Sequence, residues 1–444
     1  MDSKRISERF WKLIISIRNT GIDYQVLLII LILYKKSVLK EFINSGSENF
    51  IDTVYKSINE FSELEKELLL DLVRHFEKDL QKFNSKYLYE LNHILDEHKE
   101  DFYIIFDELL FKLEEIMGKS SGGNIQPDEI TKLMLFLADI ENGNSVFNPF
   151  SGLASFGVNL NSQVSYFAQE IVERTYIYSQ LRLLAYDKLS QVEVKCEDTI
   201  LKWPEDSKFD RIISSPPFNV DIGNIYSDSD SKTLEHFYLS KAINSISGSG
   251  KIITLVSNGL LFRSGQLKDF RKYLVDNDLI ESIISLPGNL LSSTSISTSI
   301  IVISKQKEKK GFIKFIDAST LFTESSRRAF LLTDKIVSIY QLDNDSEHTR
   351  LVSISEIAFN DYDLSVSRYF IGNITKKFQG IELDEILKKA NVEKVKSDVN
   401  VPYLKIGDLN DNEMGVYSDA FKIERREVKR SGYRLFEPVL LLAT

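Results

Sequence analysis

Beyond about residue 125, short runs of β-branched and aromatic residues alternate with longer segments whose apolar residues recur every three or four positions. The short runs have the length of strands, and the longer segments have the spacing of amphipathic helices. This alternation predicts βαβ units and an α/β fold with a mostly parallel sheet. Strands are expected at residues 146–147, 164–168, 192–195, 209–214, 251–256, 280–286, 299–304 and 312–316. Helices are expected at residues 127–139, 171–186, 233–247 and 266–277.

The first 120 residues contain no proline and keep helical spacing throughout. Leu64, Leu68 and Leu72, for example, would share one face of a helix. An all-α N-terminal domain is therefore expected at residues 1–120. The small and polar residues at 118–124 predict the loop that follows it, and the α/β domain is expected at residues 121–372. A strand predicted at 401–406 indicates a new unit within residues 373–444.

The composition is that of a globular protein, with 43% hydrophobic and 27% charged residues. The longest apolar run, residues 26–33, is far too short to cross a membrane. A single cysteine, Cys196, excludes an intramolecular disulfide and favours the reducing cytoplasm. The net charge of −10 argues against a protein that grips DNA by itself, because non-specific DNA affinity comes from Lys and Arg at the phosphates.

Small residues dominate the segment 148–157, which follows the first predicted strand. Doubly wound sheets bind nucleotides at the carboxyl ends of their strands, and glycine lets backbone amides approach such a ligand closely. A plain turn is the alternative that this segment leaves open when it is taken alone. The candidate cofactor-binding residues in it are Asn148, Pro149, Phe150, Gly152, Ala154 and Ser155.

Acidic residues follow the next two predicted strands. Glu170 comes about 20 positions after the glycine loop, where a carboxylate can accept both hydroxyls of a ribose. Asp198 follows the third strand and is of the type that accepts from the exocyclic amine of a purine. Each has an alternative explanation, since Glu170 could be a charge favoured by a helix dipole and Asp198 could cap the next helix.

The strongest signal is the tetrapeptide Ser215-Pro216-Pro217-Phe218 at the end of the fourth predicted strand. Two consecutive prolines stop both a strand ladder and a helix. They leave a rigid loop that presents the Pro216 carbonyl and the Phe218 ring at the edge of the sheet. Such a loop suits a flat base, which it can hold by stacking. A simple turn would explain the prolines, but not their position after the other motifs.

In this order, the motifs resemble the modification (M) subunit of type I restriction–modification systems, over residues 1 to about 370. Gln126 and Pro127, with the helix after them, are similar to the segment that precedes the family's cofactor loop, and residues 148–157 are similar to that loop. The resemblance identifies Glu170 as the ribose-binding acid. It further makes Asp198 the contact to the adenine ring of the cofactor, and residues 215–218 the catalytic tetrapeptide.

The resemblance implies a Rossmann-like S-adenosylmethionine-dependent methyltransferase domain, with a mostly parallel seven-stranded sheet. The implied reaction transfers a methyl group from S-adenosyl-L-methionine to the N6 amine of an adenine flipped out of double-stranded DNA, at a specific site and without a metal. Ser215 and Pro216 would accept hydrogen bonds from the amine, and Phe218 would stack on the base. In this family a specificity subunit supplies sequence reading, so an acidic methyltransferase need not bind DNA tightly alone.

The resemblance also implies partners: a specificity-type domain, fused or separate, and a restriction subunit with nuclease and translocase activity. Residues 402–409 are similar to the opening of a specificity subunit's target-recognition domain, which implies a fusion that is cut short here.

Two motifs depart from the family pattern. The cofactor loop begins with Asn148 instead of Asp and carries Gly152-Leu153-Ala154 instead of Gly-x-Gly, and Ser215 stands where Asn or Asp is usual. A catalytically weakened scaffold that binds specificity and nuclease partners is therefore one alternative function. A Rossmann-type oxidoreductase is another, disfavoured because Gly-x-Gly-x-x-Gly is missing.

Overall fold

The computed structural model describes residues 3–46, 49–117, 125–223, 231–291, 296–324, 329–342 and 344–370, together with 392–395, 398–402, 425–428 and 432–435. The chain divides into two compact units, Met1–Ile371 and Gly372–Thr444. The first unit holds both the N-terminal helices and the sheet, so the boundary expected near residue 120 stays a prediction. The predicted loop at 118–124 lies outside the described residues. None of the described helices is long and apolar enough to cross a membrane.

In the second unit, two antiparallel strand pairs are described. β12 (Val392–Val395) pairs with β15 (Gly432–Leu435), and β13 (Asp398–Pro402) pairs with β14 (Arg425–Val428). The strand expected at 401–406 overlaps the end of β13, and its remaining residues lie outside the described part.

The N-terminal region is helical, as predicted, and its core is built around α2. The apolar run at residues 26–33 lies within α2 and is almost wholly buried. Asp23 begins this helix because its side chain accepts a hydrogen bond from the Gln25 amide. The helices are α1 (Ser3–Arg18), α2 (Tyr24–Lys35), α3 (Val38–Ser45), α4 (Phe50–Ile58), α5 (Glu63–His75), α6 (Glu77–Leu80), α7 (Ser85–Glu97), η1 (Lys99–Asp101) and α8 (Phe102–Met117).

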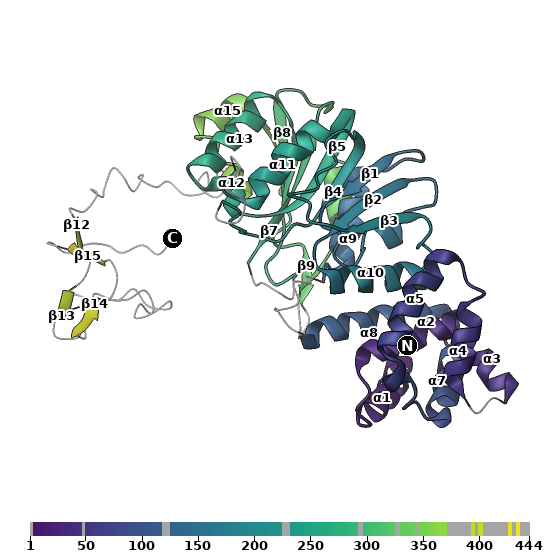
Figure 1. Cartoon of the computed structure of the whole chain (residues 1–444). Coiled ribbons are helices and arrows are strands. Elements are labelled where there is room, and N and C mark those ends of the chain that lie inside the picture. Colours follow the sequence, from purple (N-terminus) through teal and green to yellow (C-terminus); the bar gives the residue numbers. More distant parts are fainter. Residues whose placement is uncertain are drawn as a thin grey trace. The chain divides into compact units, whose positions relative to one another are not determined.

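The second part of the first unit is a nine-stranded sheet in the order β11-β8-β6-β7-β5-β4-β1-β2-β3 (Figure 1). Its strands are β1 (Ser145–Asn148), β2 (Ser165–Glu170), β3 (Val192–Cys196), β4 (Phe209–Ser214), β5 (Ile246–Ser257), β6 (Ile280–Ser285), β7 (Thr298–Ser304), β8 (Phe312–Asp317) and β11 (Thr349–Ser353). The sheet is mostly parallel, as predicted, but β7 is antiparallel to β5 and β6, and β11 is antiparallel to β8. The seven strands implied by the resemblance are present, and β8 and β11 extend them at one edge.

Helices cover both faces of the sheet, with α9 and α14 on one face and α11 and α13 on the other (Figure 1). Neighbouring strand residues therefore enter opposite cores: Ile212 packs on the α11 side and Ile213 on the α9 side. A strand buried on both faces has no polar side, which explains its continuous apolar pattern. The helical elements are η3 (Gly157–Asn159), α9 (Asp128–Ala138), α10 (Glu173–Ala185), α11 (Leu234–Ser245), α12 (Gly259–Phe262), α13 (Gln266–Asp276), α14 (Thr333–Tyr340), α15 (Ile354–Phe359) and η4 (Val366–Tyr369).

Two parts of the sheet differ from the expectation. β5 begins at Ile246 and not at 251. Its start was predicted too late because the residues after Ile246 are serine and glycine, which have the composition of a turn. The segment after β8, which shows little periodicity, contains the hairpin β9 (Phe322–Glu324) and β10 (Ala329–Leu331) and then α14, β11 and α15. These elements are short, so too few residues repeat for their spacing to be read.

A buried arginine holds the turn that follows α15. Arg271 on α13 is 2% exposed and donates to the carbonyl oxygens of Tyr362 (2.9 Å), Leu260 (3.0 Å) and Arg263 (2.8 Å). The turn needs support, because Asp361 and Tyr362 both have φ near +58° although neither is glycine. Arg271 thus ties the end of the first unit to the segment after β5.

Replacing Arg271 with Met is expected to lower the free energy of unfolding by about 3 kcal/mol, because three carbonyl oxygens lose a buried donor. Urea titration followed by tryptophan fluorescence measures this, since Trp11 and Trp203 both lie in the first unit. Lys12→Met, at an exposed position on α1, is the matched control and should change stability by less than about 0.5 kcal/mol. Equal stability of the two variants would show that Arg271 does not hold the turn.

Candidate active site

The predicted cofactor loop and the predicted catalytic tetrapeptide line one pocket at the carboxyl ends of β1 and β4. The pocket has a volume of about 50 Å³ between its walls. Phe218, which is only partly buried, forms one of these walls. The lining residues are Gln126, Phe150, Ser151, Gly152, Leu153, Ser155, Phe156, Ser215, Pro216, Phe218, Leu255 and Leu291.

Asn148, the first residue of the cofactor loop, fixes the beginning of the loop by two hydrogen bonds. Its side chain is fully buried, its Nδ2 donates to the Tyr166 hydroxyl (3.0 Å), and its Oδ1 accepts from the Phe150 amide (3.1 Å). Burial raises the pKa of Tyr166, so its phenol stays neutral and can accept. Asn148 therefore shapes the loop, and neither it nor buried Pro149 lines the pocket.

The loop and the second-strand acid are joined directly. Glu170 Oε2 accepts from the Gly152 amide (2.8 Å), and its Oε1 accepts from the Val172 amide (2.9 Å). Gly152 has φ +53°, and no atom lies within 4 Å of the position its Cβ would take, so the loop is open at this point. Burial raises the pKa of Glu170, although the amides of Val172 and Gly152 favour its ionised form.

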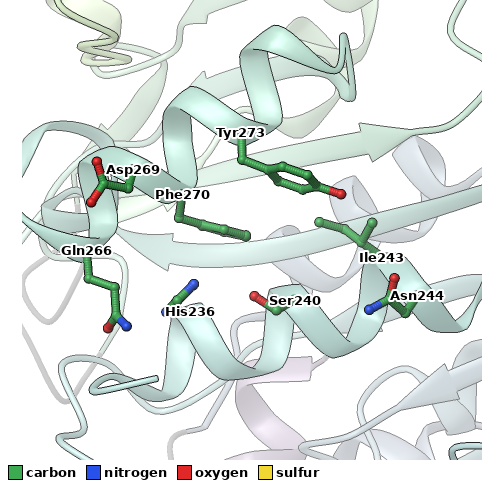
Figure 2. Close-up of a pocket in the computed structure, with 8 residues that line it drawn as sticks. All are labelled: His236, Ser240, Ile243, Asn244, Gln266, Asp269, Phe270 and Tyr273. Carbon is green, nitrogen blue, oxygen red and sulfur yellow. The ribbon is translucent and has the colours of Figure 1, made fainter. Parts of the chain in front are cut away.

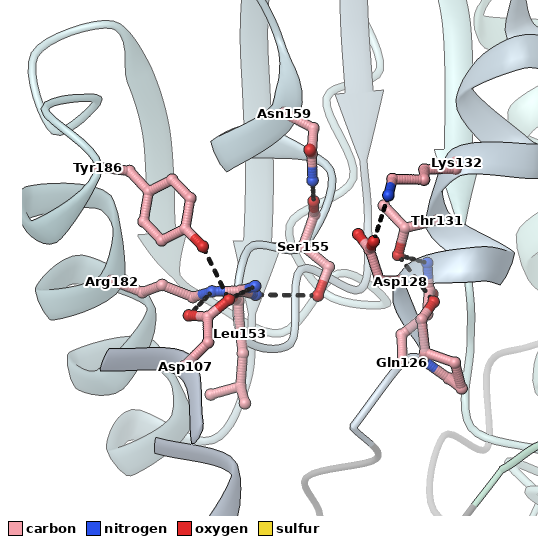
Figure 3. Close-up of polar contacts among 11 residues, drawn as sticks. Asp107, Gln126, Asp128, Thr131, Lys132, Leu153, Ser155, Asn159, Arg182 and Tyr186 are labelled. Carbon is pink, nitrogen blue, oxygen red and sulfur yellow. Dashed lines mark hydrogen bonds and ion pairs between the residues drawn. The ribbon is translucent and has the colours of Figure 1, made fainter. Parts of the chain in front are cut away.

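Ser215, at the end of β4, donates a hydrogen bond from Oγ to Gln126 Oε1 (2.5 Å). Gln126 is itself fixed, because its Nε2 donates to Thr131 Oγ1 (2.8 Å), and Thr131 Oγ1 donates to the Pro127 carbonyl (Figure 3). With its hydrogen given to Gln126, the Ser215 oxygen keeps its lone pairs for a further donor. Pro127 accepts the last of these hydrogen bonds, is buried, and immediately precedes α9.

The other predicted residues divide into two groups. Pro216 is buried and Phe218 partly buried in the pocket wall, whereas Pro217 is exposed and does not line the pocket. Asp198 also lies outside the lining, and its Oδ1 accepts from the Ile200 amide (2.8 Å). Ala154, within the cofactor loop, is buried and does not line the pocket. The binding and catalytic roles of all these residues stay predictions.

The pocket also contains residues that the sequence analysis missed. Leu255 on β5 and Leu291 after β6 complete its apolar wall. Arg182 on α10 does not line the pocket, but it bonds to Leu153 and Ser155 of the cofactor loop, as Figure 3 shows. No local pattern distinguishes these residues, because leucines and an arginine in strands and helices are common everywhere.

A second hollow, of about 340 Å³, lies between α11 and α13 and shares no residue with the first (Figure 2). Its walls combine His236 and Asp269 with the rings of Phe270 and Tyr273. It contains none of the residues that the sequence singled out. Of these two hollows in the described part of the chain, the one at the carboxyl ends of β1 and β4 combines the predicted motifs.

The donor set of the first pocket fits a nucleoside cofactor. The rings of Phe150 and Phe156 provide apolar surface in the lining. Glu170 is not among the lining residues, but its carboxylate bonds to the lining residue Gly152 and can accept from ribose hydroxyls there. Within the described residues, no cluster of His, Cys, Asp or Glu could hold a metal ion.

Comparison with known proteins agrees with this geometry. The model of the N-6 DNA methylase family matches residues 97–378. The chain is 26% identical over 353 residues to a type I restriction enzyme methylase subunit, MpnII, of Mycoplasma pneumoniae, covering 69% of this chain and 65% of that protein. It is 25% identical over 376 residues to the MjaIX methylase subunit of Methanocaldococcus jannaschii, covering 73% of this chain and 67% of that protein. The chain thus spans about two thirds of the length of these relatives.

The crystal structure of a type I restriction–modification methyltransferase subunit from Streptococcus thermophilus has the same fold. Its TM-score is 0.63 at 22% identity, and the match covers 76% of this chain and 80% of that chain. The family model covers more than half of the sequence and includes both predicted motifs. With these motifs lining a single pocket, the chain belongs to the N-6 DNA methylase family.

Proposed function

We propose that this chain transfers a methyl group from S-adenosyl-L-methionine to the exocyclic N6 amine of adenine in DNA, within a type I restriction–modification system. One observation carries the proposal: Gly152 of the cofactor loop and Ser215 of the tetrapeptide line the same pocket. Family membership and the curated methylase subunits support it. The cofactor supplies an electrophilic methyl group, and the chain supplies position and polar groups.

The adenine amine is a poor nucleophile, because its lone pair is delocalised into the ring. Ser215 Oγ and the Pro216 carbonyl would accept hydrogen bonds from its two N–H groups and direct the lone pair towards the methyl group. The N–CH3 bond forms as the S–CH3 bond breaks, S-adenosylhomocysteine leaves, and the methylated amine loses its surplus proton to solvent. Gln126 makes Ser215 suitable for this role, since it takes the hydroxyl hydrogen and leaves the oxygen as an acceptor. Positioning and preorganised dipoles then provide most of the acceleration.

The target base must leave the duplex, which costs a few kcal/mol. The ring of Phe218 would offset part of this cost by stacking. Phe218 is only partly buried at the pocket wall, so part of its ring surface is available for this stacking.

The two alternatives are less well supported. A scaffold without catalysis does not require Ser215 to be oriented, yet its hydroxyl has a fixed acceptor in the pocket. An oxidoreductase is disfavoured by the family to which the chain belongs.

As partners we propose a specificity-type domain, fused or separate, and a restriction subunit. The curated relatives are named as methylase subunits of type I restriction enzymes, which supports an assembly. Apart from Pro402, residues 402–409 lie outside the described residues, and their likeness to a target-recognition domain stays a prediction.

Ser215→Ala is expected to reduce adenine methylation about 100-fold, the typical cost of removing one aligned polar group at a reacting centre. Methylome sequencing of cells that express the complete gene reports the modified base and site, and tritium transfer reports the rate. Ser240→Ala, in the second hollow, removes the same hydroxyl elsewhere and should leave the rate unchanged. Wild-type rates in Ser215→Ala would contradict the proposed role, and absence of adenine methylation in the wild type would contradict the function.

S-adenosylhomocysteine, the product form of the cofactor, should bind more weakly as the pH falls from 7.5 to 5. Ribose hydroxyls donate to the ionised Glu170, and protonation removes that acceptor. Because burial raises the pKa of Glu170, the loss begins at a higher pH than for an ordinary glutamate. Calorimetry measures the affinity. Glu170→Gln should bind about tenfold more weakly at pH 7.5 and show no pH dependence over this range, whereas a parallel pH profile in the variant would rule out Glu170 as the titrating group.

The chain alone should bind a 30-base-pair duplex with a dissociation constant of about 1 μM or weaker at physiological salt. The physical reason is its net charge of −10, which leaves no overall surplus of Lys and Arg for phosphates. Fluorescence anisotropy measures this affinity. Nanomolar, sequence-selective binding would show that the chain reads DNA without a partner.

A further inference from the structure

The cofactor loop contains a backbone conformation that its sequence does not favour. Gly152 has φ +53°, which glycine adopts freely, but Ala154 has φ +56° and carries a Cβ. Left-handed backbone is uncommon for residues other than glycine and persists only where the surrounding structure holds it. Ala154 is fully buried, so its backbone is surrounded by protein atoms and not by water. Something in the fold must hold this residue.

Arg182 bonds to both neighbours of Ala154. Its Nη1 donates to the Leu153 carbonyl (3.0 Å) and to Ser155 Oγ (3.1 Å). Leu153 and Ser155 line the pocket, so the guanidinium is hydrogen-bonded directly to two lining residues of the loop (Figure 3). Arg182 is 5% exposed, and its geometry is fixed by its other partners.

Those other partners belong largely to the N-terminal helices. Arg182 Nε and Nη2 form a two-pronged pair with Asp107 on α8, at 2.8 and 2.6 Å. The Tyr186 hydroxyl donates to the same carboxylate (2.8 Å), and the guanidinium lies 5.2 Å from the ring of Phe111. A planar fork held on two edges by a carboxylate is the geometry that arginine provides and lysine does not.

We propose that Arg182 is a positioning residue for the cofactor, which holds the left-handed turn at Ala154 and makes cofactor affinity depend on the docking of α8 through Asp107. Arg182 does not line the pocket and acts only through Leu153 and Ser155. The proposal rests on the proposed function, because it assigns the ligand of this loop as the S-adenosylmethionine nucleoside. It explains how the loop tolerates alanine at a position where its backbone needs glycine.

The experiment uses the full chain and two measurements. Calorimetry gives the affinity for S-adenosylhomocysteine, and hydrogen exchange without ligand gives the opening of residues 151–157. Arg182→Met should weaken binding about tenfold and speed exchange in this segment at least tenfold. Arg182→Lys, which keeps the charge but loses the fork, should show an intermediate loss and covers the case in which the first variant does not fold.

A matched control and a rescue separate positioning from general stability. Lys251 on β5 forms a partly buried ion pair with Glu281 on β6 (3.2 Å), and none of its described contacts is to α8 or to the loop. Lys251→Met should lower the melting temperature and leave affinity and loop exchange unchanged. Adding Ala154→Gly to Arg182→Met should restore most of both, because glycine needs no support at positive φ.

Unchanged affinity and unchanged loop exchange in Arg182→Met would overturn the proposal. So would equal losses in Lys251→Met, or a failure of Ala154→Gly to restore either property. If the wild-type chain does not bind S-adenosylhomocysteine, the proposed function fails. The hydrogen-exchange measurement still decides whether Arg182 holds the loop.

Discussion

The guanidinium of Arg182 joins the N-terminal helices, helix α10 and the cofactor loop of the first unit. The arginine lies on α10. Its guanidinium bonds to Asp107 in the N-terminal helices and to the loop between Gly152 and Phe156. A buried charge of this kind is tolerated because every edge of it is paired. The loop that lines the pocket is therefore supported through Arg182 by both the helical and the α/β parts, and neither part alone contains all of its supports.

The site lies at an edge because of how the sheet is buried. Helices cover both faces, so only the ends of the strands remain for a ligand, and the carboxyl ends carry the loops after β1 and β4. Parallel pairing of β1 with β2 and β4 places these ends side by side. The resulting contact between Ser215 and Gln126 joins the segment before α9 to the end of β4, which are 89 positions apart in the chain.

Much of the α/β part was predictable, because its long elements repeat their pattern often enough to be recognised. The strands from β1 to β8 lie close to their expected positions, and α9, α10, α11 and α13 agree within two residues at each end. β11 and the β9–β10 hairpin were missed because they are short, and the first residues of β5 were missed because serine and glycine are typical of turns. Gln126, Gly152, Ser215 and Phe218 were predicted as site residues, and the structure brings them into one pocket.

The amino-acid sequence alone determined the fold class, the order of the motifs and the family, since these depend on local periodicity and on residue types at fixed spacing. Only the tertiary structure decided that Asn148 is a buried support and not a lining residue, that Pro217 and Asp198 lie outside the pocket, and that Ala154 adopts a left-handed backbone beside Arg182. The physical reason is that burial, hydrogen-bond partners and backbone strain arise from residues far apart in the chain. No local pattern carries information about which distant side chain will satisfy them.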